Sequence, residues 1–547
     1  MMHTLRPYQT EAVESAFNEW NDGKRSTLIV APTGTGKTQI FTEIIRRIQP
    51  ARALVLCHRE ELVYQAAKRA ESFGIAASIE MAEQTANETP WSRTPVVVST
   101  IQTQCAGANG NGRMTHFAPH EFALIVLDES HHSPAVSWRR VIDYYSQNPK
   151  LKILGLTGTP DRLDEVALGE IFDSVAYNYE PLDAIQDGWL VPVVQDFVTI
   201  DGLDYSHIRT TAGDLNGADL AAVMEAERNM QEVAAGAIDI IGDRRTVVFT
   251  VSVKQAETLA DILNRHKAGM AEWVCGATPK HLRHSRLQSF KDGTTQVLVN
   301  VGIVNEGYDE PAIEVVVQAR PTASRLLYAQ QAGRAMRPLP GVIDGLESAD
   351  ERRTAIAHSS KPTAKILDFV GNSGRHKLMT TADILGGKMT DEVIARTNER
   401  MQEKGRGART DEEIAAAIAD VEERKRKESA RKARLVAKST YRAVRVDPFT
   451  AFDVTPVRER GCDRGKMLSE KQRALLLKQG LDPDAIPYAH AKQIIGEFFR
   501  RWKGKLCTLK QAKFLKGRGI ETHDLTMAAA SAMITEIANR EGWRNKS

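Results

Sequence analysis

Short apolar runs alternate with amphipathic stretches along the first 375 or so residues of the chain. Each run is apolar throughout, which predicts a strand buried on both faces, as in a parallel sheet. Helical periodicity lies between the runs, for example at Gln39–Ile48, Glu60–Phe73 and Lys254–Arg265. The predicted strands are Leu28–Ala31, Ala53–Cys57, Val96–Ser99, Leu124–Leu127 and Ile153–Leu156, followed by Val247–Thr250, Val297–Val301, Val315–Gln318 and Ile366–Phe369. Repeated strand–helix units indicate two doubly wound α/β domains, separated near Pro181–Asp201.

The amino-acid composition changes after Gly371. Asp391–Lys438 is rich in Ala, Glu, Lys and Arg and contains no proline, which predicts one or two charged helices. Its second part runs into Arg424–Arg445, where ten basic residues stand against Glu428 alone. A charge run is usually a solvated helix face, but a run of nearly one sign weakens that interpretation.

An internal repeat occupies the C-terminal part, with an offset of 39 residues between its two units. Ser469 aligns with Thr508, and both are good N-cap residues; Gly480 aligns with Gly519, and both suit the end of a helix. Each unit is therefore predicted to be a helix, a turn and a second helix. Such a pair is typical of a protein-docking module without chemistry. Trp502 and Trp543, near the ends of the two units, are expected to pack inside them rather than stack on bases.

These patterns predict four parts in the 547-residue chain. Residues 1–190 and 191–375 form the two α/β domains, 376–465 a charged helical linker with the basic run, and 466–547 the helical repeat module. The formal net charge of +3 conceals an asymmetry between them. From Arg424 to Ser547 there are 29 basic and 13 acidic residues, a balance of +16, which leaves −13 for the rest. An acidic body with a basic tail indicates a polyanionic partner.

Composition excludes several classes of protein. No apolar run is long enough to span a membrane, and the first residues lack the apolar segment of a secretory signal. The five cysteines lie far apart and form no CxxC pair, which argues against zinc and against a disulfide scaffold. Scattered free thiols fit the reducing cytoplasm.

A candidate phosphate-binding loop follows the first predicted strand. It reads Ala31-Pro-Thr33-Gly34-Thr35-Gly36-Lys37-Thr38 and opens a predicted helix. Such a loop turns backbone N–H groups toward phosphates, and the helix N-terminus adds positive potential. Lys37 is placed to reach the β- and γ-phosphates, and the Thr38 hydroxyl to bind Mg²⁺. The motif by itself predicts only a nucleoside triphosphate site.

A pair of carboxylates ends the fourth predicted strand, at Asp128-Glu129. The carboxyl end of a strand is where α/β sheets bind ligands, so the pair is expected to face the phosphate loop. Asp128 suits the Mg²⁺ shell, and Glu129 suits a base that orients the attacking water.

These residues carry a resemblance to the superfamily 2 helicases, because Asp128-Glu129-Ser130-His131 is similar to their DEAD/DEAH box. Other motifs resemble those of the superfamily in the expected order: Leu5-Arg-Pro-Tyr-Gln9, Leu54–Glu61, Ser99-Thr-Ile-Gln102, Thr157-Gly-Thr-Pro160, Val248-Phe-Thr250, Asn300–Pro311 and Gln330-Gln-Ala-Gly-Arg334-Ala-Met-Arg337. The resemblance covers about two-thirds of the chain. It implies two tandem RecA-like domains with ATP and Mg²⁺ in the cleft between them, and an ATP-dependent nucleic-acid helicase or translocase.

The resemblance also implies roles for individual residues. Nucleotide binding falls to Gln9, Thr33, Gly34, Thr35, Gly36, Lys37, Thr38, Gly307 and Asp309. Mg²⁺ binding falls to Thr38 and Asp128, and catalysis to Glu129, Gln330, Arg334 and Arg337, the two arginines as arginine fingers. His131, Thr157 and Thr159 are expected to couple the ATP site to the second domain. Arg59, Thr100 and Thr250 are expected to contact nucleic acid.

The wording of several motifs favours DNA over RNA as the nucleic acid. Asn305-Glu-Gly-Tyr-Asp-Glu-Pro311 and Ala319-Arg-Pro-Thr-Ala-Ser324 resemble RadD-like proteins, XPB/UvsW-type remodellers and type III restriction helicase subunits. RadD-like proteins carry a cysteine-rich zinc module after the motor, which this chain lacks. Two alternatives stay open: an RNA helicase, and an ATP-gated binding subunit of a larger complex that docks through the C-terminal repeats.

Overall fold

The computed structural model describes residues 5–86, 93–106, 112–133, 135–158, 168–211, 213–305, 307–374, 376–387, 389–436, 449, 452, 455–456 and 466–540. The chain forms two compact units. The first comprises Met1–Gly387 with Ile394–Ile418, and the second Lys388–Val393 with Ala419–Ser547. The domain boundaries that the sequence suggests within the first unit stay predictions.

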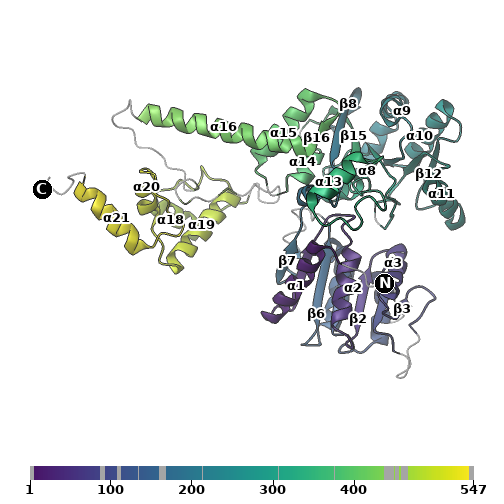
Figure 1. The fold of residues 1–547 in the computed structure, drawn as a ribbon, viewed down its shortest axis with the longest axis horizontal. Helices are drawn as coiled ribbons and strands as arrows, with labels where there is room; N and C mark the ends of the chain where they lie inside the picture. Colours follow the sequence, from purple (N-terminus) through teal and green to yellow (C-terminus); the bar gives the residue numbers. More distant parts are fainter. Residues whose placement is uncertain are drawn as a thin grey trace. The chain divides into compact units, whose positions relative to one another are not determined.

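The N-terminal lobe of the first unit is built on a seven-stranded parallel sheet with the order β3-β4-β2-β5-β6-β1-β7 (Figure 1). The strands of its centre are buried from end to end, which is why they read as unbroken apolar runs. The strands are β1 (Ser26–Val30), β2 (Ala53–Cys57), β3 (Ala77–Glu80), β4 (Val96–Thr100), β5 (Leu124–Asp128), β6 (Lys152–Thr157) and β7 (Ser174–Asn178).

Helices cover both faces of this sheet. One face packs on α1 (Pro7–Asn21), α2 (Lys37–Arg47) and α3 (Glu60–Ser72), with Val55, Val98 and Val126 in the shared core. The other face packs on α4 (Ile101–Cys105), the short helix η2 (Arg113–His116) and α5 (Val136–Tyr145). The short helix η3 (Ser130–His132) follows β5, and α7 (Pro181–Gln186) follows β7.

The second lobe repeats this plan with a seven-stranded sheet of order β12-β13-β11-β14-β15-β8-β16. All of its pairs are parallel except the short edge strand β16, which runs antiparallel to β8. Its strands are β8 (Val193–Asp204), β11 (Thr246–Thr250), β12 (Ala271–Val274), β13 (Val297–Asn300), β14 (Val315–Ala319), β15 (Ala364–Asn372) and β16 (Ala408–Arg409). A separate two-stranded ribbon joins β9 (Thr210–Thr211) and β10 (Asp214–Leu215).

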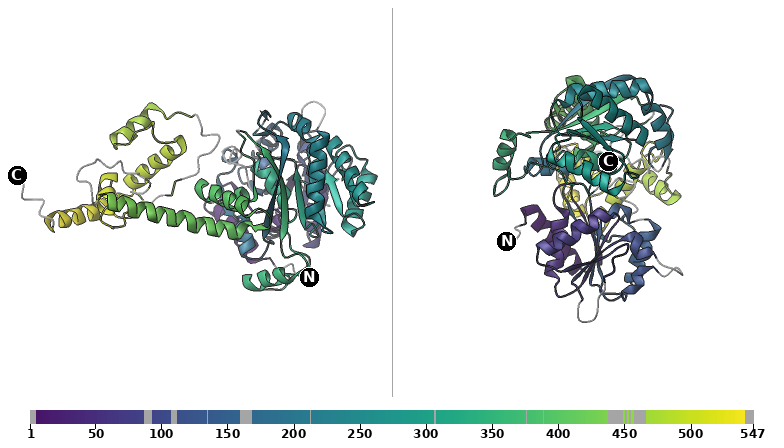
Figure 2. Two further views of the ribbon diagram at one scale, coloured as in Figure 1. Left: turned by 90° about the horizontal axis from the view of Figure 1, so that it is seen from above. Right: turned by 90° about the vertical axis from the view of Figure 1, so that its right-hand side faces the viewer.

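The helices of the second lobe include α8, α9 and α10, whose apolar side chains share one core with the sheet. Their bounds are α8 (Gly217–Met224), α9 (Glu227–Ile241) and α10 (Val253–His266), and the lobe continues with α11 (Lys280–Asp292), α12 (Arg325–Ala332), α13 (Ala349–His358) and α14 (Thr381–Leu385). Two doubly wound α/β sheets with helices on them confirm the predicted fold class (Figure 2).

Two helices belong partly to each compact unit, α15 (Asp391–Lys404) and α16 (Thr410–Val436). The second unit then contains α18 (Glu470–Lys478), α19 (Tyr488–Lys503), α20 (Leu509–Lys516) and α21 (Met527–Arg540), which are the four helices that the repeat predicts. In the described part of the chain, no helix is long and apolar enough to cross a membrane.

The two repeat units begin and end their first helices with the same devices. The Ser469 hydroxyl accepts from the Gln472 amide, the Thr508 hydroxyl accepts from the Gln511 amide, and each forms a capping box. Gly480 and Gly519 have φ of 76° and 79°, which only glycine adopts cheaply. The residue after each glycine then caps the end of the helix, because the Leu481 and Ile520 amides donate to the Leu476 and Leu515 carbonyls.

Candidate nucleotide site

The phosphate loop lies between β1 and α2, and its shape requires two glycines. Gly34 has a φ of 91°, and Gly36 caps α2 with a φ of 78°. A Cβ on Gly36 would lie 2.6 Å from Gln9 Nε2, and one on Gly34 would lie 2.9 Å from Arg337 Cγ. The loop is therefore closely approached from two sides, and side chains at these positions would collide with both neighbours.

The start of α1 holds one side of this loop. Gln9 Nε2 donates to the Thr35 carbonyl at 2.9 Å, and the Tyr8 hydroxyl donates to the same oxygen at 2.6 Å. Gln9 Oε1 accepts from the Arg6 amide at 3.0 Å, and the Thr35 hydroxyl donates to the Pro32 carbonyl. The Gln9 side chain thus holds the phosphate loop through the Thr35 carbonyl, while its role in nucleotide binding stays a prediction.

Lys37 and the two carboxylates of β5 meet beside the loop. Lys37 Nζ lies 3.7 Å from Glu129 Oε1 and donates to the Ala31 carbonyl at 3.4 Å. Burial and the neighbouring Glu129 charge raise the pKa of Asp128 to about 6, against the opposing effect of Lys37. A buried carboxylate with too little positive charge around it suits a divalent cation, so Asp128 fits the expected Mg²⁺ site. Thr38, in the first turn of α2, is half-buried.

His131 connects the carboxylates to the end of β6. Its Nδ1 lies 3.3 Å from Thr157 Oγ1 and 3.5 Å from Glu129 Oε2. These contacts bring together two of the three residues expected to couple the site, and Thr159 lies outside the described residues. The coupling role itself stays a prediction.

A row of histidines continues from this point, and the sequence patterns do not reveal it. The His131 and His132 rings lie 4.1 Å apart, and the His132 and His58 rings 4.5 Å apart. Arg59 Nε donates to His58 Nε2 at 3.2 Å, and its Nη1 donates to the Gly302 carbonyl of the second lobe at 3.2 Å. Contacts therefore run without a break from Glu129 to the loop after β13. The adjacency of His58 and Arg59 after an apolar strand is the one signal that the sequence offered.

The two motif arginines of the second lobe have different surroundings. Arg334 is buried and donates to the Tyr308 carbonyl at 2.6 Å and to the Asn305 carbonyl. Arg337 pairs with Asp309 and lies against Gly34 of the phosphate loop, while its Nε has no hydrogen-bond partner among the described residues. Burial lowers the pKa of Arg337 to about 10. A buried guanidinium with a spare N–H group fits an additional anionic oxygen.

Lys361 holds the backbone that carries Arg337, and no motif pointed to it. Its Nζ donates to the carbonyls of Arg337 and Pro311, both at 2.7 Å, and the side chain is 1% exposed. Burial lowers the pKa of this ammonium to about 7. Lys361 thus ties the segment after α12 to the segment after Asp309.

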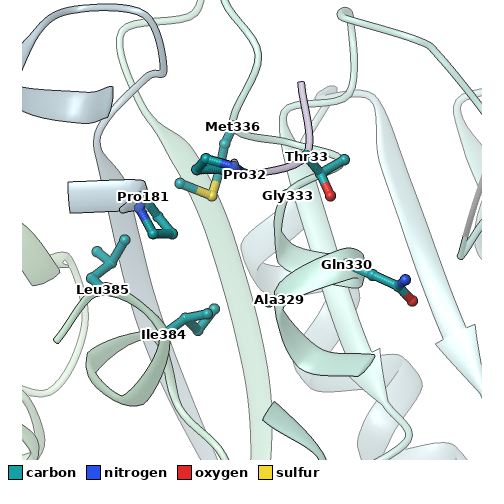
Figure 3. A pocket seen from close by; sticks show the side chains of 9 residues that line it. All are labelled: Pro32, Thr33, Pro181, Ala329, Gln330, Gly333, Met336, Ile384 and Leu385. Atoms are coloured by element: carbon teal, nitrogen blue, oxygen red, sulfur yellow. The ribbon is translucent and has the colours of Figure 1, made fainter. Parts of the chain in front are cut away.

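Phosphate loop and α12 meet around a small cavity of about 20 Å³ (Figure 3). Pro32 and Thr33 face Gly333 and Met336, which follow α12, while Gln330 on α12 is turned to one side. A volume of this size is about that of one water molecule. The two lobes therefore meet directly at the loop.

The residues expected to contact nucleic acid lie on the ends of strands. Thr100 caps α4 by accepting from the Thr103 amide, and the Thr250 hydroxyl donates to the Asn300 carbonyl at 3.0 Å. Both side chains are buried, whereas Gly307 joins the lobes by accepting from Gln65 Nε2. The nucleic-acid role of Arg59, Thr100 and Thr250 stays a prediction. Among the residues that the structure describes, no cluster of His, Cys, Asp and Glu is arranged to hold a metal ion by itself.

Comparison with protein families assigns the same two parts of the chain. Residues 2–162 match the type III restriction enzyme res subunit, and residues 231–338 match the helicase conserved C-terminal domain. Together they contain the phosphate loop, the carboxylate pair and the motif arginines, in the order found above. These matches make the chain similar to the superfamily 2 helicases. This family uses ATP, usually with Mg²⁺, and the geometry of Lys37, Asp128 and Glu129 agrees with that chemistry.

Individual relatives lie in the same helicase group. A protein of Saccharomyces cerevisiae named as a candidate ATP-dependent helicase, IRC3, is 28% identical over 68% of this chain and 52% of its own length. A protein of Halobacterium salinarum named as a candidate DNA 3'-5' helicase, Rad25, is 30% identical over 66% of this chain and 58% of its own. The chain thus spans about half the length of the curated relatives that it matches.

One solved structure shows the same fold. It is a fragment of a candidate HsdR subunit of a type I restriction enzyme from Vibrio vulnificus YJ016. The TM-score is 0.50 at 22% sequence identity, over 69% of this chain and 65% of that one. At this identity the likeness concerns the fold alone.

Proposed function

We propose that this protein is an ATP-dependent DNA helicase or translocase that hydrolyses ATP between the two lobes of its first unit. The observation that carries the proposal is the meeting of Arg337 with Gly34 of the phosphate loop. A loop that cradles phosphates and an arginine that stabilises charge on the γ-phosphoryl group belong to different lobes. Hydrolysis then depends on lobe closure, and closure is what a bound nucleic acid can favour.

The residues of the site divide the chemistry among them. Glu129 accepts the proton of the attacking water, and Lys37 leaves its contact with Glu129 to bind the β- and γ-phosphates. Arg337 donates to the γ-phosphoryl oxygens as negative charge develops on them. Arg334, held by two backbone carbonyls, positions the Tyr308 segment. Asp128 and Thr38 would hold Mg²⁺, which would neutralise part of the phosphate charge.

Duplex or branched DNA is the substrate that we propose. The wording of the motifs favours DNA, and the name of the Halobacterium relative states a DNA helicase. The acidic balance of the lobes leaves bulk attraction to the basic C-terminal part.

A nucleic-acid panel in an ATPase assay tests both the activity and the substrate. We expect duplex or branched DNA to raise the hydrolysis rate several-fold, and RNA to raise it less. The Lys37→Ala variant should lose hydrolysis with every nucleic acid, while the surface variant Lys254→Ala keeps it. Hydrolysis that no DNA stimulates, or that survives Lys37→Ala, contradicts the proposal; stronger stimulation by RNA favours the RNA alternative.

The second candidate function is an ATP-gated binding subunit of a larger complex. The match to a restriction enzyme res subunit supports it, since a subunit acts with partners, and the C-terminal repeats offer a docking module. Glu129→Gln separates the two candidates. Loss of DNA-dependent function in this variant favours the motor, and full function favours a gated clamp that needs ATP binding alone.

A reducing location, the cytoplasm, is part of the proposal. Cys57, Cys275 and Cys507 are free and buried, and Cys105 is free and partly buried. Burial raises the pKa of the Cys57 thiol well above its usual range, so the thiol stays protonated and inert.

A further inference from the structure

An aromatic pair stands out of the second helix of the first repeat. Trp502 is 76% exposed and Phe499, one turn earlier on α19, is 51% exposed. Their ring centroids lie 6.4 Å apart with the ring planes 37° apart, so the two rings form one apolar surface. The expectation that Trp502 packs inside the module is therefore wrong, and Trp543 lies outside the described residues. Exposed aromatic surface of this size needs a reason beyond folding.

The second repeat shows that the fold does not require these rings. At the offset of 39 residues, the core positions keep their character: Ala491 matches Ala530, Ile495 matches Ile534, and Phe498 matches Ile537. The exposed positions do not. Phe499 matches Ala538, and Trp502 matches Glu541. The second repeat thus serves as a control, because it forms the same pair of helices without the exposed aromatic rings.

Lysines lie near the aromatic pair along the chain. Lys503 follows Trp502, Lys505 comes two residues after the end of α19, and Lys492 lies two turns before Phe499 with its Nζ 5.8 Å from the Tyr488 ring. All three lysines are exposed, and among the described residues none of them forms an ion pair. The one acidic residue of α19, Glu497, already pairs with Arg500 and Arg501. The positive charge beside the rings is therefore uncompensated within the described part of the second unit.

The kind of ligand follows from this combination of groups. A flat, exposed indole offers a stacking surface to any base, because every base has a π-face. Lysines are sequence-independent partners of phosphate, and they bind it as point charges. A protein partner would more commonly meet an apolar surface whose rim carries both signs of charge, whereas the acidic group of this helix is taken up by Arg500 and Arg501 and the three lysines form no ion pair among the described residues.

We propose that Phe499 and Trp502, with Lys492, Lys503 and Lys505, form a binding site for single-stranded DNA. A base stacks on Trp502, and the lysines contact the phosphates on either side. The site is separate from the nucleotide site, and it deepens the proposed function by placing a strand-holding surface in the C-terminal module. The choice of DNA rests on the proposed function; the choice of a single strand rests on the stacking surface, since bases inside a duplex are not exposed.

The test measures binding of a fluorescent oligo(dT) to the full-length protein by anisotropy. Trp502→Glu copies the residue of the second repeat, so the fold should tolerate it, and we expect binding to weaken roughly 5- to 100-fold. Trp502→Phe keeps a stacking ring and should retain most of the affinity. Leu477→Lys is the matched control, since it also copies the second repeat at an exposed apolar position, and it should change affinity little.

Other arms of the test separate the causes. Replacing Lys503 and Lys505 by Gln should lower the slope of log K against log salt by about 1.4, because roughly 0.7 counterions are released per single-strand phosphate contact. Unchanged oligo(dT) binding by Trp502→Glu overturns the site, and tighter binding of oligo(U) than of oligo(dT) overturns its assignment to DNA. Basal ATPase activity should be unaltered in Trp502→Glu. Failure of the motor proposal appears instead as a lack of stimulation by DNA in the wild-type protein.

Discussion

At the scale of single residues, the structure separates two arginines that the motif treats alike. Arg334 donates hydrogen bonds to the carbonyls of Tyr308 and Asn305, which belong to its own lobe. Arg337 lies against the phosphate loop and keeps an N–H group without a partner in the described part of the chain. The sequence predicts the type and order of these residues, but only the structure shows that Arg337 is the one that lies against the phosphate loop.

Lys361 gives a prediction at this scale. Replacing it by Met removes two hydrogen bonds, to the carbonyls of Arg337 and Pro311, so the finger loses its support. We expect the ATP hydrolysis rate to fall about 10-fold, with nucleotide affinity nearly unchanged, since a positioning residue acts on the transition state. Steady-state ATPase kinetics and nucleotide binding measure the two quantities. Lys254→Met, an exposed lysine of the same lobe, is the control.

The pH dependence of stability checks the burial of Lys361 independently. Its pKa is lowered from 10.5 to about 7 in the folded protein, so the folded state binds fewer protons between these values. Because the buried amine is favoured in its neutral form, its contribution to the free energy of unfolding is fully present above pH 10.5. That contribution is lost as the pH falls through about 7, where the buried group must take up a proton. Wild-type protein should therefore gain stability between pH 7 and 10 relative to Lys361→Met. If the urea midpoints of the wild-type protein and of Lys361→Met change with pH in the same way, the ammonium of Lys361 is not buried.

At the scale of elements, a buried polar network connects the helix of the arginine motif to the sheet. Tyr328 on α12 donates to Asp368 on β15 at 2.6 Å, and Gln195 on β8 donates to the same carboxyl. Gln195 in turn accepts from Thr381 at the start of α14, and Thr381 contacts Thr410 at the start of α16. Two strands and three helices are thus fixed together by groups that are all buried. Such a network favours a single arrangement of these strands and helices, because a buried polar group left without a hydrogen-bond partner would destabilise the fold.

Asp368→Asn tests this network. Burial raises the pKa of the Asp368 carboxyl from 3.8 to about 7, so the folded state favours the protonated form. The stabilisation is complete below pH 3.8 and is lost as pH rises through about 7. We expect the wild-type unfolding free energy to fall by about 1–3 kcal/mol between pH 4 and 8, and this part of the change to disappear in Asp368→Asn. Urea unfolding at both pH values measures it, and an identical pH dependence in the two proteins would count against the network.

The same scale shows what could be predicted of the fold. Fully buried central strands such as β2 and β5 were found within a residue or two, because burial on both faces forces an apolar run. The strands β3 and β7 were missed, since they are partly exposed edges whose sequences lack that run. β8 was missed because its second half is partly exposed and mixes polar residues with apolar ones.

At the scale of the whole molecule, the acidic balance of residues 1–423 contrasts with the basic balance of residues 424–547, and this contrast bears on how the protein binds nucleic acid. Arg424 and Lys425, at the start of the basic run, pair with Glu392, while the described residues beyond them remain strongly basic. Residues 437–445 of the run lie outside the described residues. The acidic lobes attract DNA poorly by bulk charge, so the C-terminal part is expected to supply that attraction.

Truncation after residue 423 tests this division of labour. The shortened protein should keep its basal ATPase activity, since the nucleotide site lies in the first unit. Its duplex DNA affinity should depend less steeply on salt, by about 0.9 in the logarithmic slope for each phosphate contact removed. Anisotropy titrations at several salt concentrations give the slope. A slope equal to that of the full chain would make the basic run a solvated helix face.

The measurement that bears most directly on the whole account is the DNA-stimulated ATP hydrolysis rate of Arg337→Ala, with Arg337→Lys and Lys254→Ala beside it. If Arg337 completes a nucleotide site shared by the two lobes, Arg337→Ala should hydrolyse ATP about 10³-fold more slowly while still binding nucleotide, and Lys should rescue little because it lacks the planar fork. A rate close to that of the wild-type protein in Arg337→Ala would contradict the shared site, and with it the proposal that lobe closure drives the motor.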